Sequence, residues 1–142
     1  MADPVYSLTL TMVHLDTSVL IDALTGSKRS SGSLRELMES PELVAISSIV
    51  LFEWLRGPRL KKELEAQEAL FPAEGSAPFG FLEAHIAGSL YKTVKRPRGR
   101  EADLAIAACA LANEAWLWTL NADDFSDIPS LNLWKPGRSM PS

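Results

Sequence analysis

Oxygen-bearing side chains stand at four places in this sequence where a strand is expected to end or a helix to begin. Asp16 ends an apolar, strand-like run, and Glu53 lies in the helical pattern that follows the second strand. Asp103 falls in the first turn of a long apolar helix, whereas Asn121 and Asp124 come directly after a later strand. Ligands of an open α/β sheet bind beyond the carboxyl ends of its strands. We therefore expect these side chains to meet at one edge of a sheet.

Carboxylates that share a site favour the binding of a divalent cation. They repel one another and raise each other's pKa unless a cation neutralises them. All-oxygen ligand sets suit hard ions such as Mg²⁺ or Mn²⁺, which keep open positions for water and phosphate. Zinc is a poor fit, because His14 and His85 lie on different elements and Cys109 is the single cysteine. The acids thus predict a magnesium or manganese site.

Each of these acids also has a purely structural interpretation. Asp16 can cap the helix that follows it, although Thr17 or Ser18 can do the same. Glu53 can lie on a solvated helix face, and the helix dipole favours Asp103 near a helix N-terminus whatever its function. The polar residues after the later strand can form a turn. Their joint placement favours a shared site, because the purely structural interpretation needs several coincidences at one sheet edge.

Short apolar runs alternate with helical patterns along the chain, which predicts a mostly parallel sheet covered by helices. Strands are expected over 11–15, 43–47, 115–120 and 131–134. Helices are expected over 18–24, 33–40, 48–56, 59–70, 81–94 and 101–113. The last helix is apolar almost all round and should be central. The segment 71–79 carries two prolines and a glycine and is expected to be a loop.

The size and composition of the chain indicate one globular domain. It has 142 residues, of which 46% are hydrophobic and 23% charged. We place the domain at 12–136, with an N-terminal extension at 1–11 and a C-terminal tail at 137–142. A single cysteine provides no disulfide framework. The sequence shows no leader-like or membrane-spanning run, so we expect a cytoplasmic protein without a membrane partner.

Four motifs resemble, in this order, the PIN domain family and in particular the VapC-type toxins of bacterial toxin–antitoxin modules. They are LDTS at 15–18, SSIVLFE at 47–53, RGREADLAIAA at 98–108 and TLNADDF at 119–125. The resemblance runs from residue 12 to residue 134. It implies a compact α/β/α sandwich with a central, mostly parallel sheet, and the activity of a metal-dependent endoribonuclease.

The resemblance also implies roles for individual residues. By position, Asp16, Glu53 and Asp103 match the acidic metal ligands of the family. The fourth acidic position falls on Asn121, where many members have Asp, or on Asp124 three residues later. The amide of Asn121 still offers a carbonyl oxygen. With Mg²⁺ or Mn²⁺ bound, such a site lowers the pKa of a water molecule and clamps the scissile phosphate of RNA for hydrolysis.

Hydroxyl groups near the acids are candidates for supporting or substrate-binding roles. Thr17, Ser18 and Thr119 can hold the carboxylates or contact phosphate. Helix capping and strand propensity explain the same residues equally well. We therefore keep both interpretations open for these three side chains.

The charge of the chain is unusual for a protein that binds nucleic acid. The net charge is −4 and the pI is about 5.2, whereas such proteins are usually basic. Two basic stretches, 92–100 and 56–62, nevertheless lead toward the acids. Arg98 and Arg100 are the predicted phosphate contacts, and a solvated helix face is the alternative.

Three other functions remain alternatives from the residues. A phosphatase resembling the haloacid dehalogenases would use Asp16 as a nucleophile and a second Asp two residues later, where this chain has Ser18. A phospho-receiver module would have adjacent acids after the first strand, but His14 precedes Asp16 here. A PIN-like scaffold that only binds partners stays open because Asn121 replaces an acid.

The resemblance further implies partners for this chain. They are an RNA substrate, a cognate antitoxin that lies across the acidic groove, and a second copy in a homodimer. Apolar surface for these partners is expected near Trp54, Leu60 and Leu64 on the middle helices.

Overall fold

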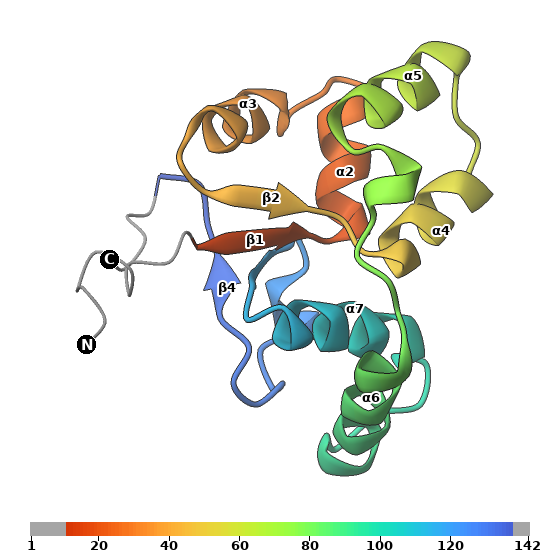
Figure 1. The fold of residues 1–142 in the computed structure, drawn as a ribbon, viewed down its shortest axis with the longest axis vertical. Helices are drawn as coiled ribbons and strands as arrows, with labels where there is room; N and C mark the ends of the chain where they lie inside the picture. Colours follow the sequence, from red (N-terminus) through yellow and green to blue (C-terminus); the bar gives the residue numbers. More distant parts are fainter. Residues whose placement is uncertain (1–10, 138–142) are drawn as a thin grey trace, which may run out of the picture.

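A computed structural model describes residues 11–137 and shows a four-stranded, parallel sheet flanked by helices (Figure 1). The strand order is β2-β1-β3-β4. The strands are β1 Met12–Leu15, β2 Leu43–Ala45, β3 Trp116–Trp118 and β4 Leu133–Trp134. The helices are α2 Thr17–Leu24, α3 Ser31–Glu39, α4 Ser48–Arg56, α5 Lys61–Leu70, α6 Phe81–Thr93 and α7 Glu101–Ala112. The predicted α/β class with a parallel central sheet is confirmed.

The first strand, β1, lies in the middle of the sheet, between β2 and β3. Its residues Val13, His14 and Leu15 are buried, as expected for a strand covered on both faces. Leu15 is in register with Trp118, so β1 and β3 end at the same level. Because the strands are parallel, their carboxyl ends open at one edge, and α2 begins there at once.

The last long helix, α7, is the most buried helix of the fold. Residues 104–110 are all buried, and α6 packs against α7 (Figure 1). A helix with no continuous polar face is stable only when other elements surround it. The predicted central position of this helix is therefore confirmed, and its polar first turn carries Asp103.

The second strand is shorter than the sequence suggests, and the reason lies at Ser47. The predicted strand 43–47 ends at Ala45, because Ser47 caps α4: its Oγ accepts a hydrogen bond from the backbone N–H of Val50 at 3.2 Å. Ser47 also forms an isolated bridge with Ala77. The predicted loop 71–79 is thereby tied to the end of the sheet.

The predicted extension at 1–11 and the predicted tail at 137–142 lie outside the described residues, except for Thr11 and Gly137. Between residues 11 and 137 no helix is long and apolar enough to cross a membrane. Cys109 is buried in α7, as its apolar surroundings predict.

Candidate active site

An open cleft at the carboxyl edge of the sheet brings together side chains from four parts of the chain. Asp16 enters it from the end of β1, Glu53 from α4, Asp103 from the first turn of α7, and Asn121 from the segment after β3. Asp124 lies next to Asn121, on the adjoining surface. The expectation that these positions meet at one edge is thus met for four of the five residues, with Asp124 beside them.

Asp16 is held by hydroxyl groups from two different segments of the chain. Its Oδ2 accepts hydrogen bonds from Ser18 Oγ at 2.8 Å and from Thr119 Oγ1 at 2.7 Å. Its backbone N–H donates to the carbonyl oxygen of Trp118 at 2.8 Å. Asp16 occupies the N-cap position of α2, but its side chain makes no capping hydrogen bond. The carboxylate is therefore oriented by the two hydroxyls and not by the helix that follows.

Glu53 is tied to the same region by Thr17. Thr17 Oγ1 donates to Glu53 Oε1 at 2.6 Å, and Arg56 Nη2 lies 3.4 Å from Glu53 Oε2. The Glu53 side chain is 17% exposed, which differs from the solvated helix face considered above. The hydrogen bond fixes one carboxylate oxygen of Glu53 against the first turn of α2.

Asp103 carries the clearest electrostatic sign of a shared acidic site. Its pKa is raised to about 6, first by burial and then by the negative charges of Asp16, Asp124 and Glu53. Arg100 acts in the opposite direction. The carboxylates are therefore close enough for their charges to interact, and the surplus of negative charge at this edge favours a cation.

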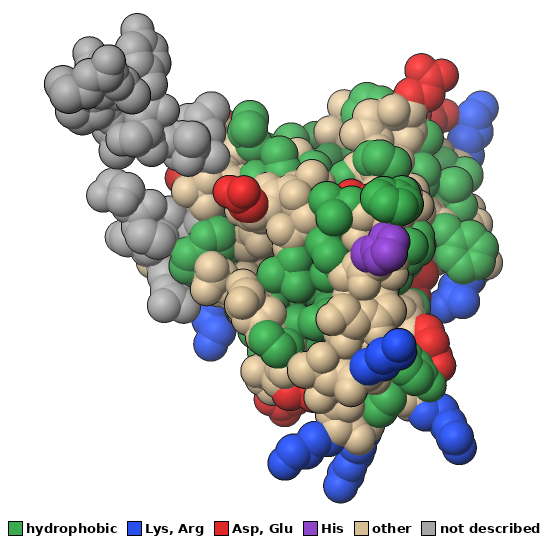
Figure 2. Space-filling view, turned by 60° about the horizontal axis from the view of Figure 1, so that its bottom comes forward, with side chains coloured by type: hydrophobic (Ala, Val, Ile, Leu, Met, Phe, Trp, Pro, Cys, Tyr) green, Lys and Arg blue, Asp and Glu red, His purple; other side chains and the backbone are tan. Residues whose placement is uncertain are grey.

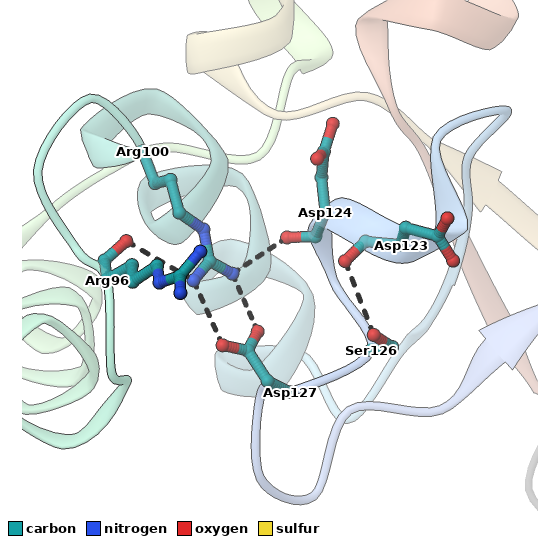
Figure 3. A network of polar contacts seen from close by, with 6 residues as sticks. All are labelled: Arg96, Arg100, Asp123, Asp124, Ser126 and Asp127. Carbon is teal, nitrogen blue, oxygen red and sulfur yellow. Dashed lines mark hydrogen bonds and ion pairs between the residues drawn. The ribbon is translucent and has the colours of Figure 1, made fainter.

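Arg100 joins the start of α7 to the loop that carries the fourth acidic position (Figure 3). Its Nη1 and Nη2 donate to the two carboxylate oxygens of Asp127 at 3.0 and 2.6 Å. Nη2 also donates to the backbone carbonyl of Asp124 at 2.9 Å. This pairing lowers the pKa of Asp127. The guanidinium of Arg100 thus donates to Asp127 and to the Asp124 carbonyl, which are groups of the protein itself.

The loop after β3 is folded by its own backbone. Asn121 N–H donates to Thr119 Oγ1 at 3.0 Å, and Asp124 N–H donates to the carbonyl of Asn121 at 2.9 Å. The residues Ala122–Asp124 form a short 3₁₀ helix. Thr119 therefore connects the carboxylate of Asp16 with the backbone of Asn121.

The donor set fits a hard divalent ion in one respect and not in another. All the cleft acids offer oxygen, which Mg²⁺ and Mn²⁺ prefer. No group of three or more His, Cys, Asp or Glu side chains within residues 11–137 is arranged so that it could hold a metal ion. Mg²⁺ usually binds one or two carboxylates and completes its shell with water and substrate phosphates. Asp16 and Asp103 contribute two carboxylates to the same cleft.

A model of the PIN domain matches residues 13–131, which is most of the chain and includes every residue of the cleft. The chain belongs to the PIN domain family. The predicted family is confirmed, and the phosphatase and receiver alternatives fall away.

Relatives of this PIN domain include a named ribonuclease, and structures similar to it include DNA-bound VapBC complexes. Ribonuclease VapC19 of Mycobacterium tuberculosis is 35% identical over 122 residues, covering 84% of this chain and 97% of the relative. The crystal structure of VapBC2 from Rickettsia felis, bound to a DNA fragment from its promoter, matches with a TM-score of 0.69 and 25% identity, covering 88% of this chain and 100% of the other. DNA-bound VapBC from Salmonella typhimurium matches in fold with a TM-score of 0.72 at 22% identity, over 89% and 98% of the two chains.

The basic residues of this PIN domain differ in their surroundings. Arg98 is exposed on the loop before α7 and has no hydrogen bond or ion pair within the described part of the chain. Arg100 is engaged by Asp127, a partner 27 residues away that no local motif indicates.

Trp54, expected on a partner surface, is instead fully buried beneath Arg59, so that expectation was wrong.

Proposed function

We propose that this PIN domain protein is a metal-dependent endoribonuclease and the toxin of a toxin–antitoxin pair. The observation that carries the proposal is the cleft in which Asp16, Glu53 and Asp103 meet, with the pKa of Asp103 raised to about 6. The relatives named as a VapC ribonuclease and as VapBC complexes support the same function.

Asp16 and Asp103 would hold Mg²⁺ or Mn²⁺, with Glu53 and the Asn121 and Asp124 segment beside them. When bound, the ion lowers the pKa of a water molecule and stabilises charge on the scissile phosphate. Asp103 must lose its proton before it can act as a ligand, so its raised pKa favours binding above about pH 6. The other cleft acids support it as neighbouring charges or ligands.

Three hydroxyl side chains would keep this site in order. Ser18 and Thr119 fix one oxygen of Asp16, which leaves its other oxygen free for the cation. Thr17 fixes one oxygen of Glu53, whose second oxygen has only the long contact to Arg56. Each carboxylate thus presents one restrained and one available oxygen, which is a geometry that suits a ligand.

We infer three further properties from the same family relationship. The substrate is RNA in the cytoplasm, with Arg98 as a phosphate contact on the loop that leads to Asp103. A cognate antitoxin binds the chain, and two copies form a homodimer. Exposed apolar side chains offer surface for these protein partners, such as Phe52 and Leu55 on α4 and Leu60 just before α5.

The test is cleavage of total cellular RNA by the purified chain, with Mg²⁺ or Mn²⁺ and with EDTA. Asp16→Asn should abolish metal-dependent cleavage, because it removes a charged ligand while keeping the shape of the side chain. Glu65→Gln, which neutralises an exposed acid on α5, is the matched control and should cleave like the unchanged protein. Intact RNA under every metal condition, from a folded chain freed of partners, would favour the binding scaffold instead.

A further inference from the structure

Arg59 is a positively charged side chain in the acidic cleft, on the connection between α4 and α5. It lines the same cleft as Asp16, Glu53 and Asp103. A cation in this place is notable because the sequence motifs of the family do not include it. Its position follows from the three-dimensional contacts of the segment 57–60.

The guanidinium of Arg59 is fixed on three sides. Its Nε donates to the backbone carbonyl of Trp54 at 2.9 Å, and its Nη1 donates to the carbonyl of Pro58 at 3.3 Å. Its Cζ lies 4.2 Å from the centre of the Trp54 ring, which is buried. Stacking of this kind favours one orientation of the planar group. Arg59 is therefore held in place before any ligand arrives.

Gly57 leaves the room that this arrangement needs. A Cβ atom at residue 57 would lie 2.7 Å from Nη2 of Arg59 and 3.0 Å from its Cζ. The backbone of Gly57 has a φ of −85°, which any residue can adopt. The absence of a side chain here thus matters for the guanidinium and not for the turn.

The charge of Arg59 has no carboxylate partner in the described part of the chain. The ion pairs found between residues 11 and 137 involve Arg29, Arg56 and Arg100. Neither hydrogen bond of Arg59 uses Nη2, so this donor remains available. Arg56 differs, since its side chain is 62% exposed and pairs with Glu53. A fixed cation with an unused donor in a cleft is suited to an anionic ligand.

We propose that Arg59 binds a non-bridging oxygen of an RNA phosphate in the cleft, through Nη2. Guanidinium groups form strong, charge-assisted hydrogen bonds with phosphate, and a preorganised one loses little entropy on binding. This role rests on the proposed ribonuclease function, because it assigns to Arg59 the positioning of that enzyme's substrate. It also gives the acidic cleft a way to attract a polyanion.

The test measures binding of a fluorescein-labelled, single-stranded 20-nucleotide oligouridylate by anisotropy, in Mg²⁺, on an Asp16→Asn background that does not cleave it. Arg59→Gln should raise Kd about tenfold, and should lower the slope of log Kd against log salt by about 0.7. Lys61→Gln, which removes one charge from an exposed residue two positions away, is the matched control and should change Kd less than about twofold.

Two further variants separate position from charge. Gly57→Ala keeps every charge but displaces the guanidinium, and should weaken binding as well. Arg59→Lys keeps the positive charge but loses the planar, forked set of donors. Its Kd for the oligonucleotide should therefore lie between those of the unchanged protein and the Arg59→Gln variant. Thermal unfolding of each variant checks that it is folded.

The results distinguish failure of this role from failure of the proposed function. The role of Arg59 is overturned if Arg59→Gln and Lys61→Gln weaken RNA binding equally. It is also overturned if Gly57→Ala and Arg59→Gln leave binding unchanged. Both conclusions hold even where the unchanged chain cleaves RNA. A chain that neither cleaves RNA nor binds the oligonucleotide overturns both. Arg59-dependent binding by a chain that does not cleave supports the phosphate site and overturns the enzyme.

Discussion

At the scale of single residues, the hydroxyl groups of the cleft decide how the acids can act. Ser18 and Thr119 both donate to the same oxygen of Asp16. Hydrogen bonds from two fixed donors hold the direction of the carboxylate. Because Oδ2 already accepts these two hydrogen bonds, it is less available to bind a cation than Oδ1. Side chains that look like helix caps in the sequence are thus the groups that orient the central acid.

His14 is a second residue whose surroundings have a measurable effect. It is buried in β1, and burial lowers its pKa to about 4. Its Nε2 lies 3.1 Å from Asn113 Nδ2, and its buried Nδ1 has no partner within the described chain. The folded protein therefore holds the neutral ring, while the unfolded chain takes up a proton near pH 6.5.

We expect stability to fall as the pH drops from about 6.5 to about 4, because only the unfolded state binds a proton on His14 in this interval. The full loss is about 3 kcal/mol. Asp103 has the opposite sign, since its raised pKa adds stability as the pH falls below about 6. Urea unfolding of the unchanged protein and of His14→Gln at pH 7 and pH 4.5 isolates the histidine, because Asp103 is common to both. Equal losses in the two proteins would contradict the prediction.

At the scale of elements, the pair of Arg100 and Asp127 connects α7 with the loop after β3 (Figure 3). Asp103 belongs to the first element, and Asn121 and Asp124 belong to the second. The ion pair and its bond to the backbone of Asp124 therefore help to set the distance between the acids, beside the core packing of Phe125 and Ile128.

Arg100→Lys should therefore weaken metal-dependent activity more than it weakens the fold. A lysine keeps the charge but cannot bond both oxygens of Asp127 and the Asp124 carbonyl together. We expect the Mg²⁺ concentration for half-maximal cleavage to rise about tenfold. The loss of unfolding free energy should stay below about 1 kcal/mol, because the Asp127 side chain is 44% exposed and its ion pair is partly screened by water. Arg29→Lys, which alters the ion pair with Asp22, is the matched control. If both variants show the same Mg²⁺ dependence, Arg100 does not position the acids.

Sequence reasoning predicted the alternation of elements and the acids that follow strands, because both depend on local patterns. Asp16 was identifiable as the residue that ends a buried strand. Asp127 was not identifiable as a site residue, since its role depends on loops that bring distant residues together. Arg59 belongs to the basic stretch 56–62 that the sequence indicates, but its fixed place in the cleft depends on its contacts with Trp54. The end of β2 was placed too late for a related reason: Ser47 continues the strand pattern in the sequence but caps the next helix in the structure.

At the scale of the whole molecule, the charge is divided between two regions. The net charge is −4, and the cleft holds several of the acids. Lys and Arg side chains gather at the lower end of the molecule in Figure 2, and Lys92, Lys95, Arg96 and Arg98 are all exposed at the end of α6 and on the following loop. Positive charge is thus available to a polyanion both inside the cleft, at Arg59, and on this exposed end of the molecule.

Arg98→Gln should raise KM for RNA about threefold and leave kcat unchanged, because the exposed side chain contributes to binding and not to the chemical step. The effect should shrink as salt rises from 50 to 200 mM, since the phosphate charge is then screened. Arg35→Gln, an exposed arginine on α3, removes the same charge elsewhere and serves as the control. Steady-state cleavage at several salt concentrations gives both constants. A fall in kcat alone would assign Arg98 a different role.

The crowding of carboxylates at the sheet edge has a consequence for the lifetime of the protein. Without a cation, the folded chain must keep mutually repelling charges together, and these charges add to the effect of burial in raising the pKa of Asp103. A ligand that binds only the folded state shifts the equilibrium away from open, protease-sensitive forms. Divalent ion supply would then govern degradation of the chain as well as its catalysis, so that metal starvation shortens the persistence of the protein.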